Sequence, residues 1–143
     1  MTNKKAKTTD AMSPYEQAKR YSDLINNRKY SEANEYRDFR GKNLSRMNLK
    51  KLDLRSADFS GAELIETNLV GANLTYSNFS EADLSGADLS DSELVRAIFV
   101  ETNLGDANFS GADLRGAKFR NSTITIGNST QTLNSRNSDD VII

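Results

Sequence analysis

Large apolar residues recur at every fifth position over most of this chain. The series begins at Phe39 and ends at Ile124, and it holds 18 leucine, phenylalanine or isoleucine residues without one exception. Two residues before each of them, 14 of the 18 positions carry Ala, Ser or Thr, and the residue in between is usually Asp, Asn or Glu. One five-residue unit therefore organises the chain from residue 37 to residue 126.

Neither a helix nor a straight strand can use a period of five. An α-helix turns by about 100° per residue, so successive apolar residues would lie about 140° apart and form no stripe. A strand alternates its faces at every residue, so an odd period would place them on opposite faces. The pattern instead predicts three extended residues followed by a bend. The small and large residues then point inward, and glycines such as Gly61 and Gly86 fall on the second bend position, where positive φ is needed.

The phenylalanines predict how many sides the coil has. Five of the six are spaced by 20 residues: Phe39, Phe59, Phe79, Phe99 and Phe119. This spacing places them in one column if four five-residue sides make a coil, whereas a three-sided coil would scatter them. We therefore expect an all-β solenoid of about 4.5 square coils with 20 residues in each.

The unit resembles the pentapeptide-repeat family. It is clearest in the two consecutive segments 82–86, Ala-Asp-Leu-Ser-Gly, and 87–91, Ala-Asp-Leu-Ser-Asp. The resemblance implies a right-handed quadrilateral β-helix. It does not imply one function, because relatives include proteins that protect DNA gyrase from quinolones, cyanobacterial proteins of mostly unassigned function, and protein-interaction modules.

The first coil departs from the small-residue rule. Arg37, Lys42, Met47 and Leu52 occupy positions that are small in later coils. Side chains of that size would overcrowd a regular interior. We expect Met47 and Leu52 to contact something stacked on that end of the coil, and Arg37 and Lys42 to extend into solvent.

The segment 13–36 supplies a candidate for that contact. Ser13, Pro14 and Glu16 are typical of a helix start, and they predict a helix that ends near Asn26. Residues 30–36 predict a second short helix, so 13–36 is interpreted as a helical hairpin that covers the N-terminal end of the solenoid; a lone tetratricopeptide-like helix pair is the alternative.

The two ends of the chain carry no repeat. We expect residues 1–12 to be disordered and 127–143 to form a polar C-terminal tail. The terminal segment 141–143 is interpreted as part of this tail rather than as a cover for the last coil. No helical element is visible after the repeat, which argues against the gyrase-protecting relatives, because these typically dimerise through one.

Composition excludes most catalytic chemistry. The chain has no Cys and no His, so it lacks thiolate nucleophiles, nitrogen or sulfur zinc ligands and the commonest general base. A convex rod without inserted loops offers carboxylates no cleft, so we expect no enzyme activity and no cofactor. No apolar run approaches 18 residues and no apolar segment follows the basic N-terminus, which predicts no membrane association and a cytoplasmic location.

Charge is segregated along the chain. Residues 37–55 carry a net charge of +5 and residues 56–113 carry −10. Half of the acids lie at outward positions where the repeat ordinarily has Asp or Asn, but Glu81, Asp91 and Glu101 lie at bends. A rigid rod with regularly spaced negative charge could occupy a cationic DNA-binding groove. A DNA mimic that binds a type II topoisomerase, without binding nucleic acid itself, is therefore the alternative function.

A second surface feature favours a protein partner. Several outward positions are apolar, and Val95, Ile98 and Val100 lie close together in sequence, with Tyr76 one coil earlier. A contiguous exposed apolar patch is unusual on a protein surface. These four residues are the candidate binding site for an unknown protein partner, and the most favoured function is a non-catalytic scaffold that presents flat walls to it. Association of copies through one end of the coil is a further expectation.

Overall fold

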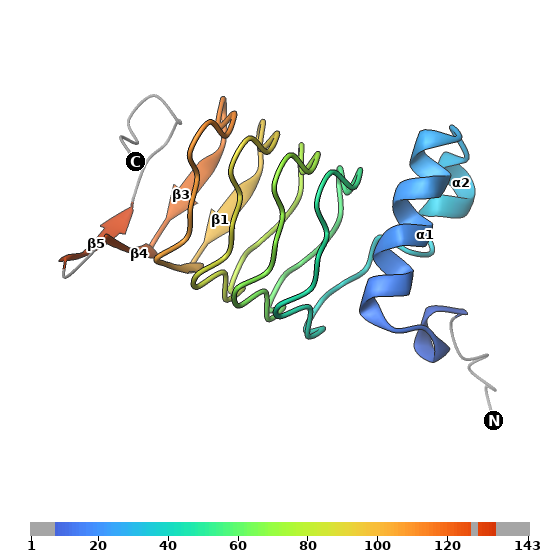
Figure 1. Cartoon of the computed structure of the whole chain (residues 1–143), viewed down its shortest axis with the longest axis horizontal. Coiled ribbons are helices and arrows are strands. Elements are labelled where there is room, and N and C mark those ends of the chain that lie inside the picture. The colour runs from blue at the N-terminus through green and yellow to red at the C-terminus, as the bar shows by residue number, and fades with distance from the viewer. Residues whose placement is uncertain (1–7, 127–128, 134–143) are drawn as a thin grey trace.

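The computed structural model describes residues 8–126 and 129–133. Short helices come first: η1 (Thr8–Ala11), α1 (Pro14–Asn26) and α2 (Tyr30–Ala33). Stacked coils follow, in which the longer extended pieces are β1 (Ile98–Val100), β2 (Asn103–Gly105), β3 (Lys118–Arg120), β4 (Ser122–Ile126) and β5 (Ser129–Leu133). Figure 1 shows the coils side by side along the long axis, with α1 beside the first coil and β4 and β5 at the other end.

Every coil pairs with the next one in a parallel register of 20 residues. Isolated bridges join positions from Asp38 with Asp58 to Glu93 with Asp113, and β1 pairs with β3 and β2 with β4 in the same register. The predicted four-sided coil is therefore observed. In chain order, we call its sides the Phe wall (37–40, 57–60, 77–80, 97–100, 117–120), the second wall (42–45, 62–65, 82–85, 102–105, 122–125), the third wall (47–50, 67–70, 87–90, 107–110) and the fourth wall (52–55, 72–75, 92–95, 112–115).

The corners have one repeated conformation. The second bend residue has positive φ at all 17 corners from Gly41 to Asn121, six of which are glycine. The residue after it donates a backbone hydrogen bond across the bend, as Ala87 N–H does to the Leu84 carbonyl at 3.0 Å. A positive φ at the second central residue is that of a type II turn. Eleven corners use residues other than glycine, which shows that the coil as a whole enforces a conformation that these residues rarely adopt.

The outward Asp or Asn of each unit closes the same bend. In 13 units its Oδ1 accepts a hydrogen bond from the backbone N–H two residues later, at 2.9–3.4 Å. Asp83, for example, accepts from Ser85 N–H at 2.9 Å. This Asx turn is the physical reason for the outward Asp or Asn of the repeat.

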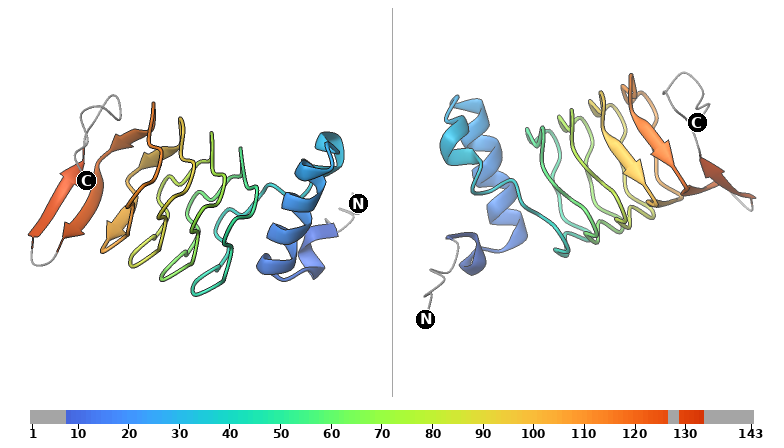
Figure 2. Two further views of the ribbon diagram at one scale, coloured as in Figure 1. Left: turned by 45° about the horizontal axis from the view of Figure 1, so that its top comes forward. Right: turned by 180° about the vertical axis from the view of Figure 1, so that it is seen from behind.

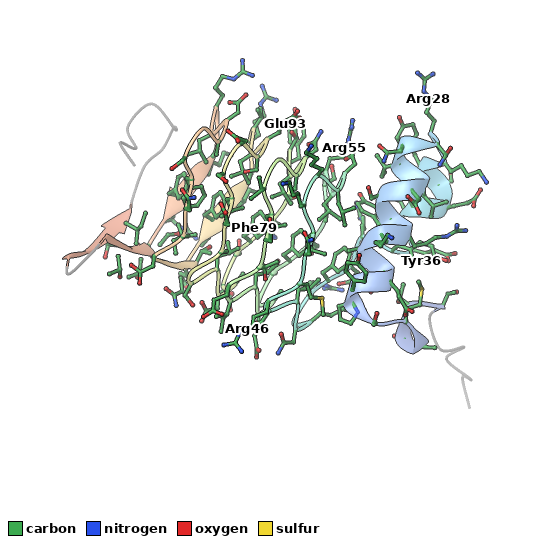
Figure 3. The ribbon with its side chains drawn as sticks, in the orientation of Figure 1. Arg28, Tyr36, Arg46, Arg55, Phe79 and Glu93 are labelled. Carbon is green, nitrogen blue, oxygen red and sulfur yellow. The ribbon has the colours of Figure 1, made fainter. Side chains whose placement is uncertain are left out.

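The interior is a set of side-chain columns. The five phenylalanines of the Phe wall stack with ring centroids 4.7–5.2 Å apart and planes within 19° of parallel. Phe109 meets Phe99 edge-on at 6.1 Å. Figure 3 places Phe79 inside the rod, between Arg55 and Glu93 on one side and Arg46 on the other. The expected inward column is confirmed, and it is dry because small residues such as Ala87 fill the space beside it.

The helical segment agrees with the sequence in part. Helix α1 has the predicted start and end, including the reciprocal capping bonds between Ser13 and Glu16. The second helix, α2, is shorter than expected and ends at Ala33. The expectation of disorder over residues 1–12 is wrong where the structure can test it, because Thr8–Ala11 form a 3-10 helix with Thr9 buried; residues 1–7 lie outside the described residues.

Helix α1 satisfies backbone groups that the first coil leaves open. No earlier coil exists to pair with these groups, so they need other partners. Buried Gln17 donates from Nε2 to the carbonyls of Tyr36 (2.7 Å) and Asp38 (2.9 Å), and the Tyr21 hydroxyl donates to the Arg55 carbonyl at 2.6 Å. Ser22 Oγ accepts from Asp53 N–H at 2.9 Å.

The oversized residues of the first coil point toward the helix. Met47 and Leu52 are partly buried and pack on the core, as expected. Arg37 is exposed, also as expected, but the expectation for Lys42 is wrong. Lys42 Nζ donates to Gln17 Oε1, because this carbonyl oxygen lies between coil and helix and has no other printed donor among the described residues.

The C-terminal end contains an element that the repeat does not predict. β5 pairs with β4 in antiparallel register, from Ser122 with Leu133 to Ile126 with Ser129, so part of the expected polar tail is a strand (Figure 2). The segment 141–143 and the rest of the tail lie outside the described residues.

The cap contact generates a first prediction. Gln17→Ala should lower the free energy of unfolding by about 1–3 kcal/mol, because it leaves two backbone carbonyls and the Lys42 ammonium without their buried partner. Urea unfolding followed by circular dichroism measures the difference. Lys19→Ala on the exposed face of the same helix is the control, and equal unfolding midpoints for the two variants would contradict the role of Gln17.

Candidate interaction surfaces

Most outward carboxylates are already used by the coil. On the second wall, Asn43 Nδ2 donates to Glu63 Oε2 at 2.8 Å and Asn103 Nδ2 donates to Asp83 Oδ1 at 3.1 Å. Glu63 and Asp83 stand in one column, where the sequence predicts repulsion. Each accepts instead from an amide on its far side, so the column alternates donors with acceptors.

Arginines neutralise several other acids. Arg55 pairs with Asp53, Arg115 with Asp113 at 2.6 Å, and Arg46 with Glu66 at 2.9 Å on a neighbouring coil. The hydrogen bond from the Arg115 guanidinium holds the pKa of Asp113 below its usual value. These pairs are exposed, so each contributes little to stability.

The described residues offer no metal-binding group. Nowhere in residues 8–126 and 129–133 do three or more Asp, Glu, His or Cys side chains gather closely enough to hold an ion. No helix in the same residues has the length and hydropathy needed to cross a membrane.

The three bend acids do not form one surface. Glu81 and Glu101 lie one above the other at the corner between the Phe wall and the second wall. Asp91 lies at the corner between the third and fourth walls, which is the diagonally opposite edge of a four-sided coil. Among the described residues none of the three forms an ion pair. Only Glu81 and Glu101, with Glu63 and Asp83 beside them, can act as one acidic strip.

The four apolar candidates gather around the Phe wall. Ile98 and Val100 flank buried Phe99 on β1 and both face outward, because side chains alternate along a strand. Val95 ends the fourth wall and Tyr76 lies at the corner between the two walls. Val95, Ile98 and Val100 are half-buried, whereas Tyr76 is 53% exposed. We call these four residues the apolar patch.

Arg96 holds the exposed tyrosine in place. It stands one coil above Tyr76 at the same corner, and its Nη1 donates to the Tyr76 hydroxyl at 3.0 Å. The guanidinium carbon also lies 5.7 Å from the centre of the ring. Arg96 therefore belongs to the surface, although the sequence did not mark it as a site residue.

A shallow cavity borders the patch on the N-terminal side. Its volume is about 370 Å³, and its lining includes Arg37, Arg40, Ala57, Tyr76 and Asn78. Arg40 is held by Asp38 at 2.8 Å and lies 3.9 Å from Asp58, and the bond to Asp38 raises its pKa. The cavity is thus polar with its charges paired, in contrast to the apolar patch beside it.

Two more cations escaped the sequence interpretation. Lys118 pairs in register with Ile98, and Arg120 pairs with Val100, so both stand on β3 next to the patch. Both are exposed and neither forms an ion pair with a described residue. Adding 20 to the number of each apolar candidate would have found them.

Comparison with known families identifies the class of protein. The profile of pentapeptide repeats matches residues 36–64, 53–91 and 87–125, with eight copies. These segments cover more than half of the chain, so the chain belongs to the pentapeptide-repeat family. Membership accords with the right-handed, quadrilateral β-helix that the resemblance implies. No curated protein matches the chain significantly.

Several solved structures are similar to this chain. A pentapeptide repeat protein from the thylakoid lumen of Arabidopsis thaliana is 34% identical over 57% of this chain and 64% of its own, with a TM-score of 0.38. HetL, a pentapeptide repeat protein of the cyanobacterium Nostoc sp. strain PCC 7120 involved in heterocyst differentiation regulation, is 31% identical over 66% of this chain and 47% of its own, with a TM-score of 0.34.

QnrB1, a plasmid-mediated fluoroquinolone resistance protein, is 16% identical over 59% of this chain and 57% of its own, with a TM-score of 0.44. The matches thus span less than two thirds of each of these three relatives. Likeness at these TM-scores does not carry a partner or an activity over to this chain.

The apolar patch generates a second prediction. Ile98 occupies the slot of the Asx-turn residue but has no oxygen to accept from Val100 N–H. Ile98→Asp should restore that turn and keep the free energy of unfolding within about 1 kcal/mol of the wild type, even though an apolar side chain is lost. Thermal unfolding measures it.

Ile98→Glu is the matched control, because the structure gives the carboxylates of Glu63 and Glu93 no such bond in the same slot. The aspartate variant should unfold at a higher temperature than the glutamate variant. The reverse order would show that the turn does not depend on this oxygen.

Proposed function

We propose that this protein is a non-catalytic scaffold that binds a protein partner through the apolar patch on its Phe wall. The observation that carries the proposal is the outward orientation of Ile98 and Val100 on β1, at positions where the preceding coil has Asn78 and Ser80. The regular coil has no need of apolar residues there, since all its walls already bury a complete interior.

Rigidity supports this function. About 4.5 coils share one hydrogen-bonded register, and the covering helix α1 fixes the first of them. A surface built on such a lattice loses little conformational entropy when a partner binds. The covering helix also supports a scaffold of defined length, because it occupies an end to which another coil could otherwise add.

Capture from an extract of the native host tests the proposal. Ile98→Asp and Val100→Asp should each reduce the recovered amount of a partner identified by mass spectrometry by at least about tenfold, because a buried carboxylate replaces an apolar contact. Val70→Asp is the matched control: it changes a half-buried valine at the same slot of the unit, on the third wall.

Capture should also be insensitive to salt, as expected for an apolar contact. The proposal fails if the two Phe-wall variants capture the partner as well as Val70→Asp does. It also fails if all three variants lose the partner together with their folded circular dichroism spectrum.

One observation favours a second candidate, a DNA mimic that binds a type II topoisomerase. Glu81, Glu101, Glu63 and Asp83 form an acidic strip along one edge and the adjoining wall. This function predicts that binding falls steeply with salt. Charge reversal at Glu81 or Glu101 should then remove any effect on gyrase supercoiling, whereas Asp91→Lys on the opposite edge should not; equal effects of the three reversals would contradict it.

A further inference from the structure

We infer that the partner of the apolar patch is an acidic segment, which sets carboxylates over Lys118 and Arg120 while its apolar side chains cover Ile98 and Val100. The inference rests on the proposed function and adds the chemistry of the partner. It is carried by the arrangement of charge around β1, coil by coil.

Charge on the Phe wall changes from one end to the other. Asp38, Arg40 and Asp58 at the N-terminal end neutralise one another. The next coil offers only amide and hydroxyl groups, and the one after it is the apolar pair of β1. The last described coil carries the two cations of β3, and the described residues supply neither of them with a carboxylate. The wall therefore ends in an uncompensated positive row.

The register sets the distance between the apolar and the positive rows. Ile98 pairs with Lys118 and Val100 with Arg120. Neighbouring strands lie about 4.8 Å apart, and outward side chains of one strand about 7 Å apart. A segment that reaches the apolar row therefore cannot avoid the field of the two cations. Opposite charge on the partner is favourable there, and a basic partner is repelled.

The lateral edges define how the segment must lie. On one side Arg96 is engaged with the Tyr76 ring and hydroxyl. On the other side Glu81 and Glu101 form the acidic corner. The carboxylates of the partner are consequently directed toward β3 and away from this corner, so that apolar and acidic groups share one face of the segment.

Three synthetic peptides of one design test the inference by fluorescence anisotropy. Each has four repeats of Leu-Ser-X-Ser, which places leucine and X on the same face of an extended chain, and X is Glu, Gln or Lys. The glutamate peptide should bind the full-length protein with a Kd at least about tenfold lower than the glutamine peptide, and the lysine peptide should bind least at the patch.

Paired variants locate the site. Lys118→Glu/Arg120→Glu and Ile98→Ser/Val100→Ser should each weaken the glutamate peptide by about tenfold or more. Two matched controls should leave it unchanged: Lys50→Glu/Lys51→Glu makes the same change of net charge at the third wall and its corner, and Ile65→Ser/Val70→Ser removes outward apolar residues from other walls. The charge-reversed β3 variant should now prefer the lysine peptide.

Three results would overturn the inference: equal affinity for the glutamate and glutamine peptides, equal weakening by the Lys50 and Lys118 double variants, or no saturable binding of the glutamate peptide. Lysine-peptide binding that depends on Glu81 and Glu101 would assign ligand binding to the acidic strip instead. If Ile98→Asp abolishes partner capture but the charge-reversed β3 variant does not, the proposed function stands and only the acidic chemistry of the partner is wrong.

Discussion

The left-handed residue at every corner is the constraint on which this structure depends. It turns the chain by one side of a square after each five residues, and only then do residues 20 apart become neighbours. Everything else follows from that closure. The interior admits one large and one small side chain per side, the phenylalanines stack, and the Asp or Asn between them finds the backbone N–H that it closes. Residues such as Tyr76 and Arg96 adopt this conformation without being glycine, because ladder bonds on both sides determine their backbone.

The same closure explains where the molecule can vary. An inward substitution changes a filled column, whereas an outward one changes only a grid of surface groups. Function on such a rod is therefore expected where the outward grid departs from the repeat. The departures at Ile98 and Lys118, two adjacent sites in one column, replace the Asp and Asn of earlier coils with an apolar group and a cation. A repeat that held its pattern at these positions would present an uninterrupted polar wall.

The periodic part of the fold was predictable from the sequence because each position repeats one physical demand. The spacing of the phenylalanines alone distinguished four sides from three, and Ser13 with Glu16 marked the start of α1. The rest lacked such a signal. Nothing periodic marks β5, whose pairing depends on the one strand beside it, and the bond from Lys42 to Gln17 depends on how α1 docks. The candidate site was predictable as a list of outward apolar residues. Its cationic neighbours and the separation of Asp91 from Glu81 required the register between coils.

The central claim is that residues 20 apart are neighbours, since the adjacency of the patch and the β3 cations rests on it. The chain has no cysteine, so pairs of introduced cysteines report distance without interference. Ser80→Cys/Val100→Cys places two thiols at equivalent outward positions of adjacent coils, within the Cα separation that a disulfide spans. Ser85→Cys/Val100→Cys places them 15 residues apart, as a three-sided coil would require. Mass spectrometry after mild oxidation should find an intramolecular disulfide in the first variant and free thiols in the second; a disulfide in the second and free thiols in the first would contradict the account.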